Sequence, residues 1–211
     1  MRCLAGLLFL LSGCLASKPQ PCSSPPLMSG AFTVTTQNEK LLTTAQYLYD
    51  ALGERIRIFE QGTYENKTFI RDVLLLYREG AMYDIFDNNR TCKKTPLKAA
   101  FQPLEVPKTA SLLGQVILGS SSKPGGGLLV NSWWGELSEK AGKFLTTVTE
   151  FGCIPINSLY QTEDFGWTVI NFFDNIIGIS DPNLLNPPDF CSNADTEKEP
   201  VDFLSLFHKK N

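Results

Sequence analysis

The chain has 211 residues, of which 43% are hydrophobic, and its 19 basic and 22 acidic side chains give a net charge of −3. A mildly acidic chain with scattered lysines lacks the basic surface that nucleic-acid binding requires, so we expect no nucleic-acid partner. The length suits one domain with its own hydrophobic core.

The first 17 residues are typical of a secretory signal peptide. An apolar run at 4–11 follows a positive start, and small residues lead to cleavage near Ala16 or Ser17. This run is much shorter than the roughly 20 residues of a membrane-spanning helix, and no later run is long enough. The alternative is a bacterial lipobox at 11–14 that would leave a lipidated cysteine, but the glycosylation signals described below disfavour it. We therefore expect a secreted protein without a transmembrane segment.

Strand patterns dominate residues 18–191, which we expect to form one β-domain. Residues 54–60 (ERIRIFE) alternate charged and apolar side chains, which is typical of a strand with one solvent-exposed face. Residues 73–77 are apolar throughout, as in a strand buried on both faces, and Glu79-Gly80 after them predicts a hairpin turn. Ten strands are expected: 30–36, 43–49, 54–60, 71–78, 81–87, 115–118, 128–134, 143–150, 156–161 and 167–173. Gly, Pro or Asn residues separate these strands, which predicts antiparallel sheets that fold over one another.

The tail, residues 192–211, differs in composition. A polar, acidic stretch precedes Val201, Leu204 and Phe207, which recur at three-residue spacing before two lysines. This pattern predicts a short amphipathic C-terminal helix, although such a short apolar stripe is marginal alone and disorder is the alternative.

Four cysteines remain after the signal peptide: Cys22, Cys92, Cys153 and Cys191. In a secreted chain they predict two disulfides, with three pairings open at this point. A zinc site is not expected, because none of the four forms a CxxC motif and no histidine lies near them.

No sequence feature indicates catalysis. The single histidine, His208, lies near the end of the tail, where no rigid scaffold would position an imidazole. The GxSxG, HExxH and phosphate-loop motifs are missing, and nothing marks a pair of glycosidase carboxylates. We therefore expect a non-enzymatic protein without an organic cofactor.

Two sequons predict N-glycosylation of a secreted chain. They begin at Asn66 and Asn89, and both fall at expected strand connections, where a glycan can reach water.

Aromatic residues gather in the later strands and suggest an apolar pocket that could hold a lipid tail. Trp133 and Trp134 are adjacent, so on a strand they must face opposite sides of the sheet. Ordinary core packing is the alternative. The candidate lining residues are Trp133, Trp134, Phe165, Trp167, Phe172 and Phe173.

Two groups of side chains are candidate ligands for calcium, because hard cations prefer oxygen ligands. One group is Asp84, Asp87 and Asn89, and the other is Asp181 and Asn183. No EF-hand spacing is present, and turn formation would explain these residues equally well.

Several segments in order along the mature chain carry a more specific signal. They are QPCSSPPL (20–27), YD (49–50) with ERIRIFE, VLLLYREGAMYDIFDNNRTCKK (73–94), PLEVP (103–107), the tryptophan pair, GCIP (152–155), DPNLLNPPDFC (181–191) and the ending 203–208. Together they resemble the ependymin family, and the ending resembles the fish brain forms in particular.

The resemblance implies a secreted glycoprotein associated with calcium binding, cell–matrix adhesion and neural plasticity, with related forms in lysosomes. It also implies a homodimer and a fold of two stacked antiparallel sheets around a deep hydrophobic pocket, similar to bacterial lipoprotein carriers. The implied disulfides join Cys22 to Cys153 and Cys92 to Cys191. The third disulfide of mammalian-type members is lacking, so a lysosomal location is less secure than secretion.

Two functional hypotheses follow from these sequence features together with the resemblance. The first is a non-enzymatic protein that binds a hydrophobic or lipid ligand between its sheets. The alternative is an adhesion glycoprotein that meets the extracellular matrix through its glycans, calcium and dimer surface.

Overall fold

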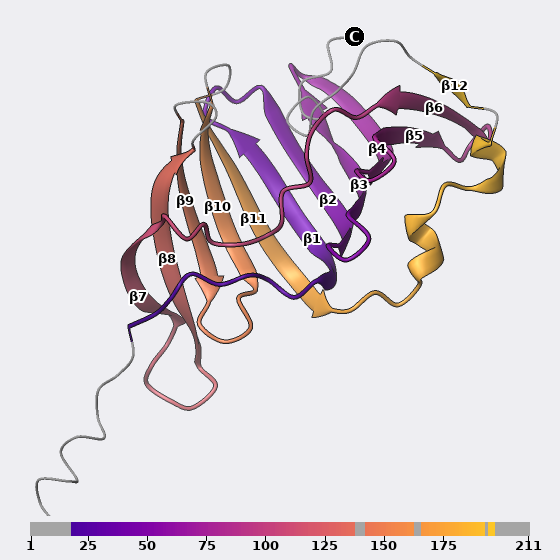
Figure 1. Cartoon of the computed structure of the whole chain (residues 1–211). Coiled ribbons are helices and arrows are strands. Elements are labelled where there is room, and N and C mark those ends of the chain that lie inside the picture. Colours follow the sequence, from indigo (N-terminus) through magenta and orange to yellow (C-terminus); the bar gives the residue numbers. More distant parts are fainter. Residues whose placement is uncertain (1–17, 138–141, 163–165, 193, 197–211) are drawn as a thin grey trace, which may run out of the picture.

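The computed structural model describes residues 18–137, 142–162, 166–192 and 194–196 (Figure 1). The predicted signal peptide, His208 and the predicted C-terminal helix lie outside these ranges. None of the helices in the described ranges has the length and apolar character needed to cross a bilayer. The strands are β1 (Leu27–Thr36), β2 (Leu41–Asp50), β3 (Arg55–Tyr64), β4 (Lys67–Leu76), β5 (Ala81–Phe86), β6 (Thr91–Pro96), β7 (Ser111–Gly119), β8 (Gly127–Leu137), β9 (Gly142–Thr149), β10 (Pro155–Thr162), β11 (Gly166–Ile177) and β12 (Asp195–Thr196).

The β-dominated fold class is confirmed, but the strands form one sheet where two were expected. The 12-stranded sheet has the order β12-β6-β5-β4-β3-β2-β1-β11-β10-β9-β8-β7. Because β1 pairs with both β2 and β11, the early and late strands share one hydrogen-bonded ladder. The only parallel pair among the described strands is β12 with β6.

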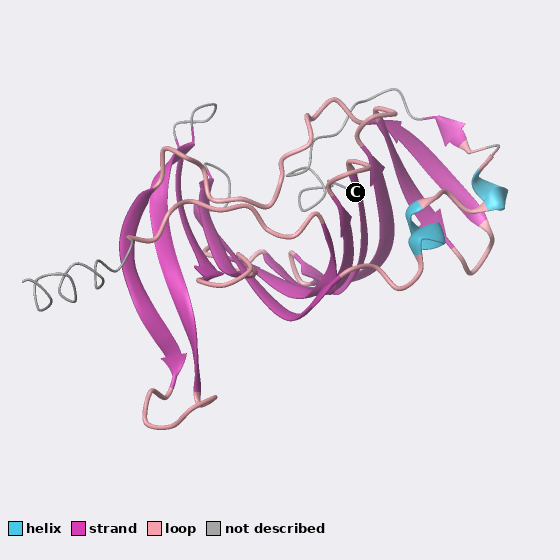
Figure 2. Cartoon of the chain, turned by 60° about the horizontal axis from the view of Figure 1, so that its bottom comes forward, coloured by secondary structure: helices cyan, strands magenta, loops and turns pink. Residues whose placement is uncertain are grey.

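This sheet is bent into a trough (Figure 2). Register shifts interrupt three of its ladders, between Ser29 and Ala31 in β1, between Pro155 and Asn157 in β10, and between Leu112 and Gly114 in β7. An extra residue in one strand bends that strand and increases its twist. A long sheet with several such irregularities curls, and its concave side becomes an inner face.

Each of the ten expected strands coincides with an observed one, whereas β6 and β12 were not predicted. The sequence of β6, TCKKTP, is polar because this strand lies near the margin of the sheet, where alternate side chains meet water. β12 has only two residues and lies within the segment expected to be a tail.

Side chains alternate between the two faces of the trough. Phe32 of β1, Tyr47 and Tyr49 of β2, and Val73 of β4 are buried in one cluster on the concave face. The residues between them point to the convex face, as Leu42 does. These two faces are called concave and convex below.

Two segments cross the concave face, residues 20–26 and 97–110, and we call them the strap (Figures 1 and 2). The ring of Phe101 stacks on Tyr49 at a centroid distance of 5.9 Å. The backbone amide of Leu104 donates a hydrogen bond of 3.0 Å to the Tyr49 hydroxyl. The disulfide between Cys22 and Cys153, with a Cα–Cα distance of 6.0 Å, fastens the strap beside β9 and β10.

The convex face of β4 to β6 is covered by the chain that follows β11. This chain includes the 3₁₀ helices η2 (Pro182–Leu185) and η3 (Asp189–Cys191). Leu185 is fully buried against a cluster that contains Leu74 and Ile85. The second disulfide, Cys92 to Cys191, holds η3 to β6. Both disulfides therefore have the pairing that the resemblance implies.

Candidate functional site on the concave face

Three aromatic rings from neighbouring strands form the centre of the concave face. Phe32 of β1 lies 5.9 Å from both Tyr47 of β2 and Phe172 of β11, and Tyr47 meets Phe172 edge-on at 6.0 Å between centroids. The Tyr47 hydroxyl donates a 2.5 Å hydrogen bond to Oδ1 of Asn175. Burial raises the pKa of Tyr47 far above its ordinary value, so this hydroxyl stays neutral in the physiological range.

The rim of this cluster is only partly covered. Tyr64, Phe69, Ile170 and Phe172 are half-buried and pack against the buried core. Ile170 pairs with Val34 of β1, which is fully buried, so the half-buried residues continue the apolar floor. A concave surface with large apolar side chains that remain partly accessible is the chemistry that an apolar ligand requires.

A buried charged cluster lies beside this floor. Arg71 of β4 donates a 2.6 Å hydrogen bond to Asp84 of β5 and lies 3.4 Å from the Glu60 carboxylate of β3. The two acids are only 3–6% exposed in their side chains. Burial raises the pKa of Glu60 to about 7, with the Arg71 guanidinium opposing this rise and the Asp84 carboxylate adding to it. Glu60 therefore changes its charge near neutral pH.

Glu60 is expected to make the stability of the protein depend on pH. Between its ordinary pKa of 4.5 and about 7, the native carboxyl holds a proton that the unfolded chain has released. The free energy of unfolding therefore falls by about 3 kcal/mol as pH rises through this window. Urea denaturation of Glu60→Gln should show this fall reduced, whereas Glu65→Gln, which removes an exposed pair with Lys40, should keep it. An unchanged pH profile in Glu60→Gln would contradict the assignment.

The structure divides the predicted pocket residues between the two faces. Trp133 is buried and Phe172 is half-buried on the concave face, whereas Trp134 and Phe173 are 41% and 40% exposed on the convex face. Trp167 also belongs to the convex side, because its neighbour Thr168 is buried on the concave one. Phe165 lies outside the described residues. Strand alternation separates these aromatics, so the five that are described do not line one pocket.

Two of the predicted calcium ligands, Asp84 and Asp181, accept hydrogen bonds from other residues. Asp84 accepts hydrogen bonds from Arg71, and Asp181 caps η2 by accepting a 3.0 Å bond from the Asn183 amide. Asp87 lies in the turn after β5. Within the described part of the chain, no three acidic, histidine or cysteine residues gather as a metal site would require.

Both sequons lie in exposed turns. Asn66 belongs to the turn between β3 and β4, and Asn89 to the turn between β5 and β6, where its Oδ1 accepts a 2.6 Å hydrogen bond from Thr91.

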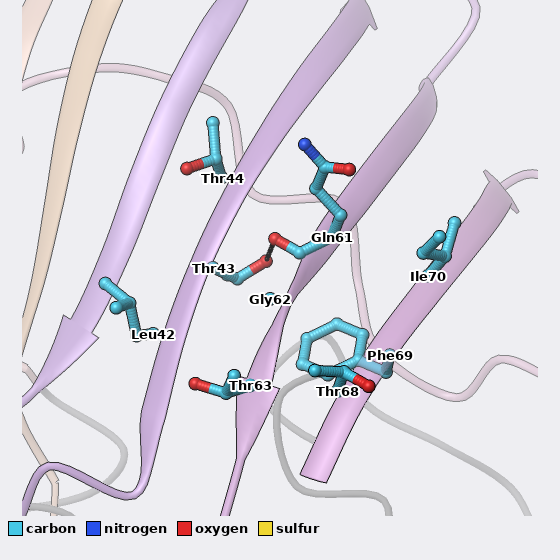
Figure 3. A pocket seen from close by; sticks show the side chains of 9 residues that line it. All are labelled: Leu42, Thr43, Thr44, Gln61, Gly62, Thr63, Thr68, Phe69 and Ile70. Carbon is cyan, nitrogen blue, oxygen red and sulfur yellow. Dashed lines mark hydrogen bonds between the residues drawn. The ribbon is translucent and has the colours of Figure 1, made fainter. Parts of the chain in front are cut away.

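Two cavities lie elsewhere on the sheet, and Phe69 of the concave rim also lines the first of them. One of about 420 Å³ lies at the ends of β2, β3 and β4 (Figure 3). The other, of about 640 Å³, lies between β5, β6 and the chain from Pro187 to Thr196.

Sequence reasoning missed the strap and the charged cluster. Arg71 and Asp84 occupy positions whose alternate neighbours Val73 and Met82 are buried apolar residues on the same face. The charged cluster could have been predicted from these charges at core positions of alternating strands, because a charge at such a position needs a buried partner.

Comparison with known proteins identifies the family. A family model described as Ependymin matches residues 65–191. Ependymin-2 of Carassius auratus is 32% identical over 195 residues, which cover 92% of this chain and 90% of the relative. Mammalian ependymin-related protein 1 of Mus musculus is 28% identical over 189 residues, which cover 85% of this chain and 80% of the relative.

Among solved structures, an uncharacterized conserved protein from Thermus thermophilus aligns with a TM-score of 0.48 at 11% identity, over 93% of this chain and 99% of that one. The family model matches more than half of the chain, and the Carassius relative exceeds 30% identity over nearly all of it. This chain belongs to the ependymin family.

Proposed function

We propose that the protein is a secreted, N-glycosylated and non-enzymatic carrier that binds a hydrophobic or lipid ligand on its concave face. The observation that carries this proposal is the aromatic floor of Phe32, Tyr47 and Phe172 with its half-buried apolar rim. The strap crosses the same face (Figure 2), and its Phe101 packs against this cluster and adds to the apolar surface there.

A ligand-binding experiment can use two isoleucines of β11 that lie on opposite faces. Ile170 is on the concave face, and Ile176 pairs with Ser29 on the convex face and is 65% exposed. Replacing Ile170 with threonine keeps the β-branched shape and removes apolar contact worth about 1 kcal/mol, or roughly fivefold in Kd. Titration of a fluorescent fatty acid should show this loss for Ile170→Thr and no change for Ile176→Thr. Equal affinities of the two variants for the fatty acid would exclude the concave face as the binding site.

The alternative function is adhesion through a dimer surface, the glycans and calcium. The observation that favours it is β7, which ends the sheet and whose nine residues, SLLGQVILG, carry no charge. Leu113, Val116, Ile117 and Leu118 of this strand are 44–55% exposed. Edge strands usually carry charges or prolines that prevent pairing with another chain, and β7 has neither.

We therefore place the homodimer contact at β7, which would pair with the same strand of a second copy. Sedimentation should show a dimer that Val116→Lys converts to monomer. Calcium and matrix binding are proposed on the family resemblance alone, and calorimetric titration of the glycosylated dimer with Ca²⁺ tests the first of them. A dimer that persists in Val116→Lys would exclude the β7 contact.

A further inference from the structure

An unusual surface lies on the convex side at the ends of β2, β3 and β4. The cavity of about 420 Å³ found there is lined by six residues of the convex face, Leu42, Thr44, Gln61, Thr63, Thr68 and Ile70, and by Thr43, Gly62 and Phe69, which alternate with them (Figure 3). Ile70 is 83% exposed and Leu42 is 56% exposed. Aliphatic side chains so open to water, around a hollow, indicate a surface that something covers.

The lining combines apolar and hydrogen-bonding groups. Thr44, Gln61 and Thr68 are exposed, so their hydroxyl and amide groups face water between the two aliphatic side chains. Gly62 pairs with Thr43 and Phe69, and a Cβ there would collide with the carbonyl oxygen of Leu42, so β2 and β3 approach closely at this point. A pyranose ring matches this surface, because it has apolar C–H faces and a rim of hydroxyls.

A sugar attachment point lies at the end of the same two strands. Glu65 and Asn66 form the two-residue turn between β3 and β4, with φ values of 47° and 65°. Positive φ at both positions is the signature of a type I′ hairpin turn, which asparagine tolerates well. Thr68 lies two residues after Asn66, and Ile70 lies four residues after it. Four residues of extended strand span about 13 Å. The lining is therefore within reach of the first sugars of a glycan on Asn66.

We propose that the N-linked glycan of Asn66 folds back over this cavity and covers Leu42 and Ile70. The inference rests on the glycosylation included in the proposed function. It gives this glycan a structural role: it shields exposed apolar side chains of the secreted protein and is itself held against the sheet. The glycan of Asn89 has no such role and serves as the matched comparison.

The test uses the full-length protein from a secretory eukaryotic host, in native buffer. An amidase that releases N-linked glycans is added, and mass spectrometry follows each site over time. Release from Asn66 should be severalfold slower than release from Asn89. In Ile70→Thr and in Leu42→Thr, the glycan of Asn66 should be released faster, while the release rate of the Asn89 glycan should not change. Because both side chains are exposed, these variants should fold normally.

A second readout measures the covered surface directly. Asn66→Gln should increase the fluorescence of a dye that binds apolar surfaces, and Asn66→Gln with Ile70→Thr should reverse the increase, whereas Asn89→Gln should have no effect. If Asn66 carries no glycan in the secreted protein, the glycosylation premise fails. Suppose instead that Asn66 is glycosylated, that its glycan is released as fast as the glycan of Asn89, and that neither threonine variant changes this release rate. The docking proposal is then overturned, while the glycosylation premise stands.

Discussion

Replacing both Cys22 and Cys153 with alanine is expected to lower the free energy of unfolding by about 4–5 kcal/mol. The two residues are 131 positions apart, so their bond removes much of the conformational freedom of the unfolded chain. The same bond fastens the strap, because the Val106 amide donates a hydrogen bond of 2.8 Å to the Cys22 carbonyl and the Ser24 hydroxyl donates one of the same length to the Cys153 carbonyl. The variant should therefore also release an apolar ligand faster than the wild type.

The second disulfide provides the control. Cys92 and Cys191 are 99 positions apart. Their bond holds the chain that follows β11 against the convex face, and it does not hold the strap. Their double alanine variant should lose a similar free energy of unfolding and keep the ligand dissociation rate. Urea denaturation and stopped-flow displacement of a fluorescent fatty acid measure the two quantities. Equal dissociation rates in the two double variants would show that the strap does not retain the ligand.

Arg71→Met is expected to destabilise the protein by about 3–5 kcal/mol at neutral pH. The change removes the guanidinium that binds Asp84 and lies beside Glu60, two buried acids, and removing one partner of a buried ion pair is costly. Arg78→Met is the matched control, since the Arg78 and Glu54 side chains are 62% and 39% exposed and such pairs contribute about 0–1 kcal/mol. The midpoint of urea denaturation measures both changes. Similar small shifts in the two variants would mean that the charged cluster does not stabilise the fold.

The strands were predictable because burial follows a local period of two residues. The alternation in 54–60 and the apolar run at 73–77 predicted β3 and β4, and the adjacent Trp133 and Trp134 do face opposite sides. The pairing of β1 with β11 was not predictable in this way. It joins segments separated by more than a hundred residues, and no local pattern encodes which distant strand a strand will meet.

The sequence predicted an aromatic, apolar site but not most of the residues that form it. Phe172 lies on the concave floor as expected, but its partners Phe32 and Tyr47 come from β1 and β2, far away in the sequence. Aromatic clustering along the chain indicated the wrong neighbours, because adjacent residues on a strand point to opposite faces. The face that a residue occupies depends on its register, which the bulges shift.

Native mass spectrometry of the protein secreted by a eukaryotic host tests the central proposal most directly. The folded chain should carry, or take up from an added fatty acid, one apolar molecule that is lost on unfolding. Retention should be weaker in Ile170→Thr than in Ile176→Thr. A folded chain that stays at its bare glycoprotein mass with every fatty acid and phospholipid offered would contradict the carrier function.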